Sequence, residues 1–406
     1  MGGTTLDGKT KIIAALWFFQ VANYLDRVAI SFAGPSIMAD LSLDPARFGV
    51  VLSCFGIGYF LAQVPGGLLA DRWGAKPLLI IAPLFWALFT GMTGLVAGVA
   101  GFIAVRTCFG LSEGISNACC YQVIGDHFDR ERRARAIGFW ATAFAVGPAF
   151  AGPLVSALLA AHGWRYVFLL MAAPALVAAL VNARYIPARR AERTGIVPAG
   201  AEGSFAAALR QPALWLMSLV YFAFNIAYWG YLSWMPSYLA QAHHVDIKAL
   251  GLLGGIPYVS ALGGLLLAGW LASGPCLRHR APLLLGSYLS AGAFLYLAYQ
   301  AQSLPLSLAG LSGAAFFLYG GLSPFGAIVL DLAPARCRAA YAGIVNTAGQ
   351  IGGATAPVVV GFLVGVSGNF SSGFGLMIGS LVLAAAGLLG ATRLTTMPSE
   401  SALPAR

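Results

Sequence analysis

The chain alternates between long apolar stretches and short polar intervals. Each apolar stretch is close to the ~20 residues that an α-helix needs to cross a bilayer. Twelve such stretches are present, at residues 12–38, 48–70, 78–98, 101–124, 136–160, 166–186, 212–240, 249–272, 282–301, 307–330, 340–366 and 373–393. The pattern therefore predicts an all-α integral membrane protein with twelve transmembrane helices.

The longest polar interval divides these helices into two sets of six. It spans residues 187–211 and contains Pro187, Pro198 and a run of arginines, a composition typical of a linker. We therefore predict an N-terminal six-helix bundle over 1–186, a cytoplasmic linker over 187–211 and a C-terminal six-helix bundle over 212–406.

The two sets of helices are related in sequence. When the chain is shifted by 205 residues, "RARAIGFWATAFAVGPAFAGPLVSAL" aligns with "RAAYAGIVNTAGQIGGATAPVVVGFL", and ten of the 26 positions are identical. The matches include Arg133 with Arg338, and Asp126 superposes on Asp331 just before them. Repeated helical halves around a central site are typical of secondary transporters, whereas channels and membrane enzymes have no general need of them.

Composition and charge agree with the membrane prediction. Hydrophobic residues make up 59% of the 406 positions and charged residues 9%, against about 25% in soluble domains. The net charge of +10 could suggest nucleic-acid binding, but with both termini inside, 19 of the 24 Lys and Arg fall in cytoplasmic segments. This split follows the positive-inside rule, so the basic residues set topology and contact anionic lipid, and we expect no nucleic-acid partner.

The reactive residue types do not form a catalytic or metal-binding pattern. The six cysteines have no spacing typical of a disulfide framework or a metal site, and the five histidines fall in predicted loops. We therefore expect neither an enzyme nor a cofactor or metal.

Four charges interrupt the predicted helices, namely Asp26, Arg27, Arg106 and Glu113. Each would cost about 2.5–3.5 kcal/mol at a helix centre, so each needs a partner, water or a function. Asp26 and Arg27 are adjacent and point about 100° apart, so they cannot pair well with each other. Arg106 and Glu113 lie two turns apart on one helix face, too far for direct contact.

These charges suit the transport of an organic anion with protons. The guanidinium of Arg27 can hold a carboxylate with two hydrogen bonds. Asn23 and Tyr24 lie on the same side of its helix and are further candidates for substrate binding. A carboxyl near the membrane midplane, such as Glu113, can carry a proton, and Asp26 is a second candidate, with Arg106 nearby. The alternatives are that Arg27 extends to the outer interface, that Glu113 is a structural partner of Arg106 or Arg27, and that Asp26 only orients an arginine.

The second set of helices contains no predicted intramembrane charge. Its contribution to a cavity should therefore be neutral hydrogen bonds and aromatic walls. Asn346 and Gln350 lie one turn apart in a helix of small residues and are the strongest candidates, and the seventh stretch adds Asn225, Tyr228, Trp229 and Trp234. Aromatic residues in a bilayer are otherwise most often core or interface residues.

Six segments of the chain match known motifs. "GGLLADRWGAK", with Asp71, Arg72 and Lys76 in place, resembles the loop signature of the major facilitator superfamily. Five more segments are "NYLDR", "SCFGIGYFLAQVPGG", "RTCFGLSEG", "GWRYVF" and "GIVNTAGQIGGATAP". Their combination resembles a narrower group of that superfamily, the anion:cation symporter family of sugar-acid, aromatic-acid and sialic-acid carriers.

This resemblance implies a fold of two pseudo-symmetric six-helix bundles and a role for individual residues. It implies that Arg27 binds the substrate carboxylate, that Asp26 and Glu113 carry the coupling proton, and that Tyr24 and Tyr59 line the cavity. "GPAFAGP", over 147–153, resembles a signature of antiporters with one extra residue, but the plainer interpretation is tight Gly/Pro packing of helices.

The loop charges at repeated positions form a further hypothesis. Inter-helix ion pairs at the cytoplasmic helix ends would stabilise the outward-facing state, or the same charges would only set topology. The set is Asp71, Arg72, Lys76, Asp126, Arg133, Asp331 and Arg338.

The sequence thus predicts a secondary active transporter that imports a small organic carboxylate with protons by alternating access. The alternatives are an anion exchanger or a proton-driven exporter of the same fold, and sodium coupling stays open. We expect a monomer in the cytoplasmic membrane of a bacterium, with both termini cytoplasmic.

Overall fold

The computed structural model describes residues 6–128, 130–188, 209–333 and 338–396, and these residues are almost entirely helical. The first half contains α1 (Leu6–Asp40), α2 (Pro45–Trp73), α3 (Ala75–Thr93), α4 (Val99–Gly114), α5 (Ser116–His127), α6 (Arg130–Ala141), α7 (Ala143–His162) and α8 (Trp164–Tyr185). The second half contains α10 (Pro212–Ala242), α11 (Ile247–Ser273), the short η1 (Leu277–His279), α12 (Arg280–Gln300), α13 (Leu304–Leu332), α14 (Arg338–Ser367) and α15 (Ser371–Thr396).

Two predicted membrane helices are each divided at one residue. Ile115 separates α4 from α5 and Thr142 separates α6 from α7, but both residues keep helical dihedral angles, with φ −70° and ψ −28° at Ile115 and φ −60° and ψ −25° at Thr142. Because the chain does not change direction there, α4 with α5 and α6 with α7 each form one rod. The described residues therefore form twelve membrane-length rods, which confirms the predicted fold class.

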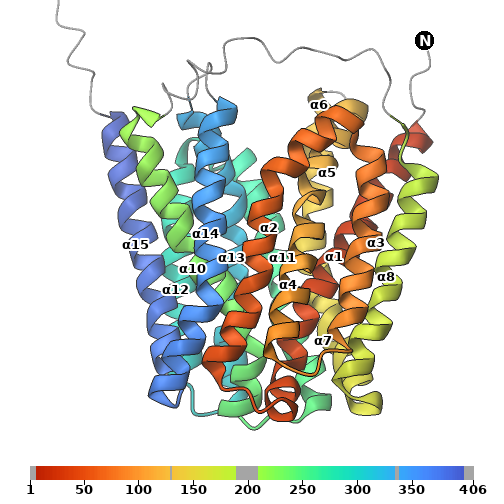
Figure 1. The fold of residues 1–406 in the computed structure, drawn as a ribbon. Coiled ribbons are helices and arrows are strands. Elements are labelled where there is room, and N and C mark those ends of the chain that lie inside the picture. The colour runs from red at the N-terminus through yellow and green to blue at the C-terminus, as the bar shows by residue number, and fades with distance from the viewer. Residues whose placement is uncertain (1–5, 129, 189–208, 334–337, 397–406) are drawn as a thin grey trace, which may run out of the picture.

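Ten of these rods are long and apolar enough to be recognised as membrane spans by length and composition. The other two are α1 and the α4–α5 rod. They contain the four charges Asp26, Arg27, Arg106 and Glu113, and α4 alone is only 16 residues long. In Figure 1 both run through the bundle like their neighbours. Their low apolarity therefore reflects the polar groups that they bring inside the protein.

The helices of each half lie together (Figure 1). The start of α1 and the end of α15 lie at the same end of the molecule, which we call the terminal end; the opposite end is the far end. The halves meet mainly where α2 packs on α14 and where α7 packs on α11. The predicted linker, 187–211, falls largely outside the described residues, so its boundaries stay a prediction.

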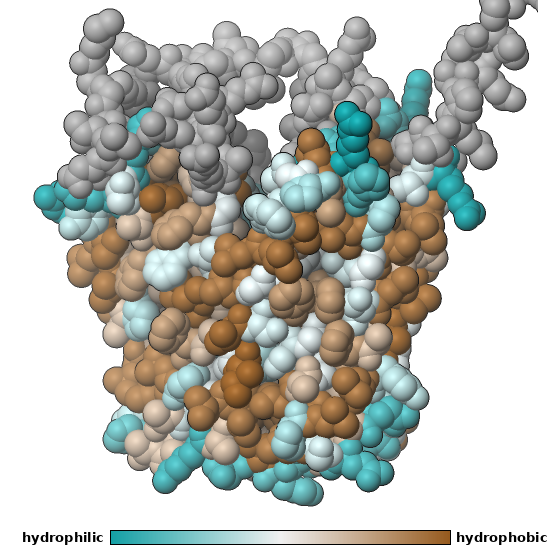
Figure 2. Space-filling model, turned by 180° about the vertical axis from the view of Figure 1, so that it is seen from behind, coloured by the Kyte–Doolittle hydropathy of each residue, from teal (hydrophilic) through white to brown (hydrophobic). Residues whose placement is uncertain are grey.

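The outer surface is suited to lipid. Figure 2 shows a broad hydrophobic band between hydrophilic residues at the two ends of the molecule. Large apolar side chains of this band are exposed, for example Leu180 at 70%, Leu252 at 67% and Phe362 at 57%. In water such a surface would aggregate, so the band marks the zone in contact with the bilayer.

Candidate functional site

The site is centred on Arg27, which α1 places deep inside the bundle. Its side chain is 4% exposed and pairs with Glu113 of α4, a residue with no exposed surface. Arg27 Nη2 donates to Glu113 Oε2 at 2.8 Å, and Nε donates to the same oxygen at 3.1 Å. Nη2 also donates to Asn23 Oδ1 at 3.2 Å. The sequence left the partner of Glu113 open between Arg27 and Arg106, and the structure selects Arg27.

Four aromatic rings surround the guanidinium of Arg27. The ring centroids of Tyr24, Tyr59, Phe55 and Trp229 lie 4.6, 4.8, 4.9 and 5.5 Å from Arg27 Cζ. Such contacts favour a desolvated cation through the negative face of each ring. Because Trp229 belongs to α10 and the other three to α1 and α2, the cage joins the two halves of the protein.

A cavity of about 430 Å³ extends from Arg27 toward the terminal end. Eight of the candidates named from the sequence line it. The first half contributes Tyr24, Arg27 and Tyr59, and the second half contributes Asn225, Tyr228, Trp229, Asn346 and Gln350. We call this cavity the vestibule. Its polar wall is completed by residues that include Gln63 and Asn117. Tyr121, which also lines it, is 50% exposed and marks its mouth.

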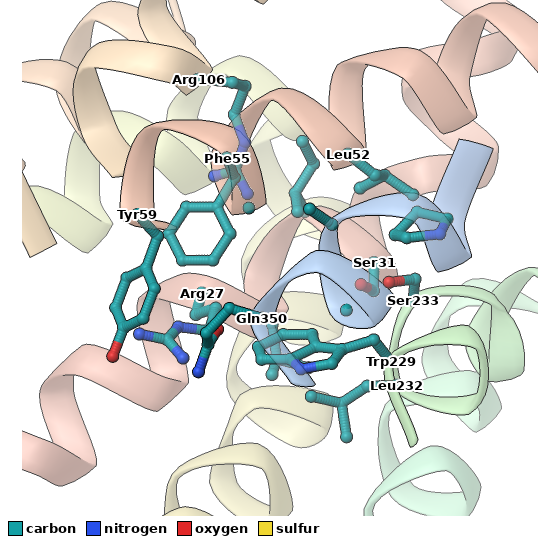
Figure 3. Close-up of a pocket in the computed structure, with 16 residues that line it drawn as sticks. Arg27, Ser31, Leu52, Phe55, Tyr59, Arg106, Trp229, Leu232, Ser233 and Gln350 are labelled. Carbon is teal, nitrogen blue, oxygen red and sulfur yellow. The ribbon is translucent and has the colours of Figure 1, made fainter. Parts of the chain in front are cut away.

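On its other side Arg27 borders a second and much smaller cavity. This far-side pocket has a volume of only about 30 Å³. Its lining includes Ser31, Phe55, Arg106, Ser233 and Gln350 (Figure 3). A volume of this size holds about one or two water molecules. Arg27 therefore lies between a wide cavity on the terminal side and a narrow one on the far side.

Beyond the far-side pocket, the two halves are in direct backbone contact. A Cβ atom on Gly49 of α2 would lie 2.6 Å from the carbonyl oxygen of Pro357 in α14, and one on Gly361 would lie 2.4 Å from that of Pro45. Trp234 Nε1 donates to the Pro357 carbonyl at 3.0 Å. The small residues thus allow α2 and α14 to close the far end, and Trp234 belongs to this barrier rather than to the cavity.

The stretch that resembles an antiporter signature packs at a similar seam. A Cβ atom on Gly147 of α7 would lie 2.8 Å from Cβ of Tyr24, and one on Gly152 would lie 2.5 Å from the carbonyl oxygen of Gly251 in α11. These contacts support the interpretation of 147–153 as close helix packing between α1, α7 and α11.

Comparison with known proteins identifies the family. A family model described as Major Facilitator Superfamily matches residues 16–357. This chain is a member of the Major Facilitator Superfamily. The match covers well over half of the sequence and includes both Arg27 and Glu113. It agrees with the twelve-rod architecture, and the protein is a transporter rather than an enzyme.

Curated relatives and a solved structure agree with this assignment. The chain is 31% identical over 385 residues to the probable L-galactonate transporter of Escherichia coli K12, covering 89% of this chain and 84% of the relative. It is 28% identical over 394 residues to the hexuronate transporter of Bacillus subtilis 168, covering 92% of each. A bacterial homologue of the human lysosomal transporter Spinster, solved in an inward-facing and unoccupied conformation, has a TM-score of 0.79 at 20% identity and covers 98% of this chain and 100% of its own. This last likeness concerns the fold.

Asp26 and Arg106, the other two buried charges in the described part of this superfamily member, have different surroundings. Asp26 Oδ2 accepts a hydrogen bond of 2.6 Å from Thr90 of α3, and Asp26 lines neither cavity. Arg106 is 3% exposed and lies with its Cζ 5.0 Å from the ring centroid of Phe55. Among the described residues, Nε of Arg106 finds no hydrogen-bond acceptor. As expected from helix geometry, Asp26 does not pair with Arg27. Glu113 pairs with Arg27 and not with Arg106.

The predicted gating charges lie near the terminal end and are only partly described. Asp331 of α13 pairs with Arg280 of α12, with Arg280 Nη1 and Asp331 Oδ2 at 2.6 Å, so this ion pair lies within the second half. Arg72 and Asp126 are exposed and Lys76 is partly buried. The side chains of Asp71, Arg133 and Arg338 lie outside the described residues. The inter-helix network therefore stays a prediction, and Arg280 is a partner that the sequence analysis did not name.

The sequence analysis also missed part of the cavity lining. Phe55 and Gln63 were quoted only within a motif, although they lie one turn before and one turn after Tyr59 on the same face of α2. This four-residue spacing was a usable signal. Tyr121, Phe144, Asn117 and Tyr221 had no comparable signal, because their position depends on how α5, α7 and α10 pack around the vestibule. Asn23, by contrast, was predicted to bind substrate but lies beside Arg27 without lining either cavity.

Proposed function

We propose that this protein imports a sugar acid together with protons, by alternating access, across the cytoplasmic membrane of a bacterium. The observation that carries the proposal is the position of Arg27. It is a buried cation at the boundary between a wide and a narrow cavity, and its acidic partner is one buried carboxylate. A site that binds an anion from one side and releases it to the other needs this arrangement.

The substrate carboxylate would bind to the free edge of the Arg27 guanidinium. Nε and Nη2 of Arg27 donate to Glu113 and Asn23, so Nη1 is the nitrogen that would bind the substrate. The sugar hydroxyls would be bound by neutral groups of the vestibule such as Asn346, Gln350 and Tyr228. A volume of about 430 Å³ is typical of a small-molecule site. The named relatives, for L-galactonate and hexuronate, support the choice of a sugar acid over an aromatic acid.

Glu113 couples the anion to the proton through competition for Arg27. A second carboxylate beside the same guanidinium would leave one negative charge uncompensated in a desolvated site, which is strongly unfavourable. Glu113 therefore takes up a proton when the substrate binds, and it can give up this proton only after the substrate has left. Asp26 accepts a hydrogen bond from Thr90 and does not pair with Arg27. It would therefore influence the site without contacting the substrate.

The orientation of the molecule follows from the charge bias along the chain. If both termini are inside, 19 of the 24 Lys and Arg are cytoplasmic, as the positive-inside rule requires. We therefore assign the terminal end to the cytoplasmic side. The vestibule then opens to the cytoplasm and the α2–α14 contacts close the outer side. This is an inward-facing state. Rocking of the two halves about Arg27 would open the outer side, and one protomer contains every part of the site, so a monomer suffices.

The proposal is tested by proton entry into proteoliposomes. Vesicles loaded with a pH-sensitive dye in sodium-free buffer receive L-galactonate, D-glucuronate, aromatic acids and short aliphatic acids one at a time, all ionised. We expect the interior to acidify with one or both sugar acids and not with the other classes. The absence of acidification with every acid, combined with uptake that needs a second anion trapped inside, would instead identify an exchanger.

A further inference from the structure

A row of buried polar groups runs from the Arg27–Glu113 pair toward the terminal end, outside the vestibule. Asn23 and Gln20 follow Arg27 on one face of α1 at intervals of four and three residues. Gln20 Nε2 donates to Asn23 Oδ1 at 3.4 Å, and Asn23 Oδ1 also accepts from Arg27. Both amide side chains are at most 2% exposed, and neither lines the vestibule.

Four polar atoms along this row have no partner among the described residues. They are Glu113 Oε1, Ser116 Oγ, Asn23 Nδ2 and Gln20 Oε1. Ser116 lies one turn beyond Glu113 toward the terminal end. Buried polar atoms in proteins almost always bind protein or ordered water, and a buried water makes about three hydrogen bonds. These four atoms supply donors and acceptors suited to a file of water.

Aromatic side chains separate this row from the vestibule. Phe144 stacks on Tyr24 at 4.9 Å between centroids, Trp140 packs on Phe144 at 5.1 Å, and Tyr121 packs on Trp140 at 5.2 Å. Tyr24, Phe144 and Tyr121 line the vestibule, whereas Trp140 is fully buried. A substrate in the vestibule therefore contacts the rings and not the amides of Gln20 and Asn23.

The row ends where polar groups become accessible. One turn before Gln20, Trp17 Nε1 donates to the hydroxyl of Thr142 at 2.9 Å. Thr142 is partly exposed and lies at the junction of α6 and α7. From Arg27 to Trp17 the row covers ten residues of α1, which is about 15 Å along the helix.

We propose that the proton leaves Glu113 along this row, which we call the α1 track, rather than through the vestibule with the substrate. Water held by Ser116, Asn23 and Gln20 relays the proton from the carboxyl of Glu113 toward Thr142, the partly exposed end of the row on the terminal side. The side chains position the water and are not themselves protonated. As the proton leaves, Glu113 becomes a carboxylate and closes on Arg27, so the substrate cannot rebind. The inference rests on the proposed proton coupling of this site.

Gln20→Met tests the track, because methionine has nearly the shape of glutamine but holds no water. Gln63→Met is the matched control, since Gln63 lines the vestibule. Two rates are measured with L-galactonate and D-glucuronate: proton-coupled net uptake followed by an internal dye, and counterflow at equal pH. In counterflow the loaded carrier exchanges labelled for unlabelled substrate, so the proton need not leave Glu113.

We expect Gln20→Met to slow net uptake at least 10-fold and to leave counterflow within 2-fold of the wild type. Gln63→Met should change both rates by the same factor. Gln20→Ala, which leaves space for an additional water, should recover most of the net uptake. If Gln20→Met does not fold, Gln20→Ala serves as the test in its place. Its ratio of net uptake to counterflow should be measurably lower than that of the wild type, but by less than 3-fold.

The outcomes separate the two proposals. Equal slowing of net uptake and counterflow in Gln20→Met, or no slowing of either, would contradict the track while leaving the proposed function in place. A wild-type protein that takes up neither sugar acid with protons would contradict the proposed function and the track with it.

Discussion

The two halves of the protein contribute different chemistry to one cavity. In the first half Asp26, Arg27, Arg106 and Glu113 are all at most 5% exposed. In the described part of the second half, the buried polar residues are neutral, such as Asn225, Ser233 and Ser237. The two halves are nevertheless related to each other by the internal sequence repeat. The buried charges thus lie together in the first bundle. The second bundle can therefore move against the first without separating a buried ion pair.

The largest expected effect comes from the cation of the first half. Arg27→Lys keeps the positive charge but loses the planar donors that bind Glu113 and a carboxylate together. We expect sugar-acid uptake to fall by roughly 100-fold, equivalent to about 2.7 kcal/mol, since hydrogen bonds between charged groups are worth about 1.5–3 kcal/mol. Initial rates of labelled L-galactonate uptake in proteoliposomes measure this.

Arg165→Lys is the matched control. Arg165 pairs with Asp40 in the exposed region at the far end, 2.5 Å from Nη1 to Oδ2. Exposed pairs contribute little, so uptake should stay near the wild-type rate. An Arg27→Lys variant as active as this control would show that the charged half does not bind the anion through its guanidinium.

The second effect concerns the seam where the halves meet. Gly49→Val places side-chain atoms where even a Cβ lies 2.6 Å from the Pro357 carbonyl oxygen, so α2 and α14 cannot close the far end. We expect net uptake to fall by roughly 10-fold or more, because a clash of about 1.4 kcal/mol already shifts the equilibrium tenfold. Accessibility of a cysteine placed in the far-side pocket, read by a membrane-impermeant thiol reagent, should rise.

Gly67→Val, in the same helix, is the control for this variant. A Cβ atom on Gly67 meets nothing within 4 Å. If both glycine variants slow uptake equally, the loss comes from the helix itself and the seam between the halves is not the moving contact.

The smallest effect is expected from the neutral half. Asn346→Ala removes one neutral hydrogen-bonding group from the vestibule, where Asn346 Nδ2 lies 3.5 Å from Gln63 Oε1. One such bond contributes about 0.5–1.5 kcal/mol, so KM should rise by roughly 3–10-fold. The number of protons per substrate, measured from dye and label together, should not change. A change in that number would place proton handling in both halves and remove the contrast between them.

The sequence was sufficient for the helices and the charges, because both depend on local composition. Asp26, Arg27, Arg106 and Glu113 stand out in apolar stretches whatever the packing. Helix geometry also predicts that the side chains of Asp26 and Arg27 point in different directions. The structure agrees, because Asp26 accepts a hydrogen bond from Thr90 whereas Arg27 donates to Glu113.

The sequence was not sufficient for contacts between helices. Both Arg27 and Arg106 were possible partners for Glu113, and only the arrangement of the helices in the bundle, which brings Arg27 of α1 to Glu113 of α4, selects Arg27. The seam between Gly49 and Pro357 depends on the register of α2 against α14, which no local pattern specifies. Gln20 was not predicted as a functional residue, because a single amide in an apolar stretch is not a signal by itself. Its role is suggested only by the unpartnered buried polar atoms that the structure shows.

The competition between Glu113 and the substrate for Arg27 is the central claim, and Glu113→Gln tests it most directly. Glutamine keeps the size of the side chain but holds no carboxylate, so it mimics the protonated state. In proteoliposomes, counterflow of labelled L-galactonate should continue at a rate close to that of the wild type, while uptake driven by a pH gradient should be lost. Uptake by Glu113→Gln that still follows the pH gradient as in the wild type would contradict the account.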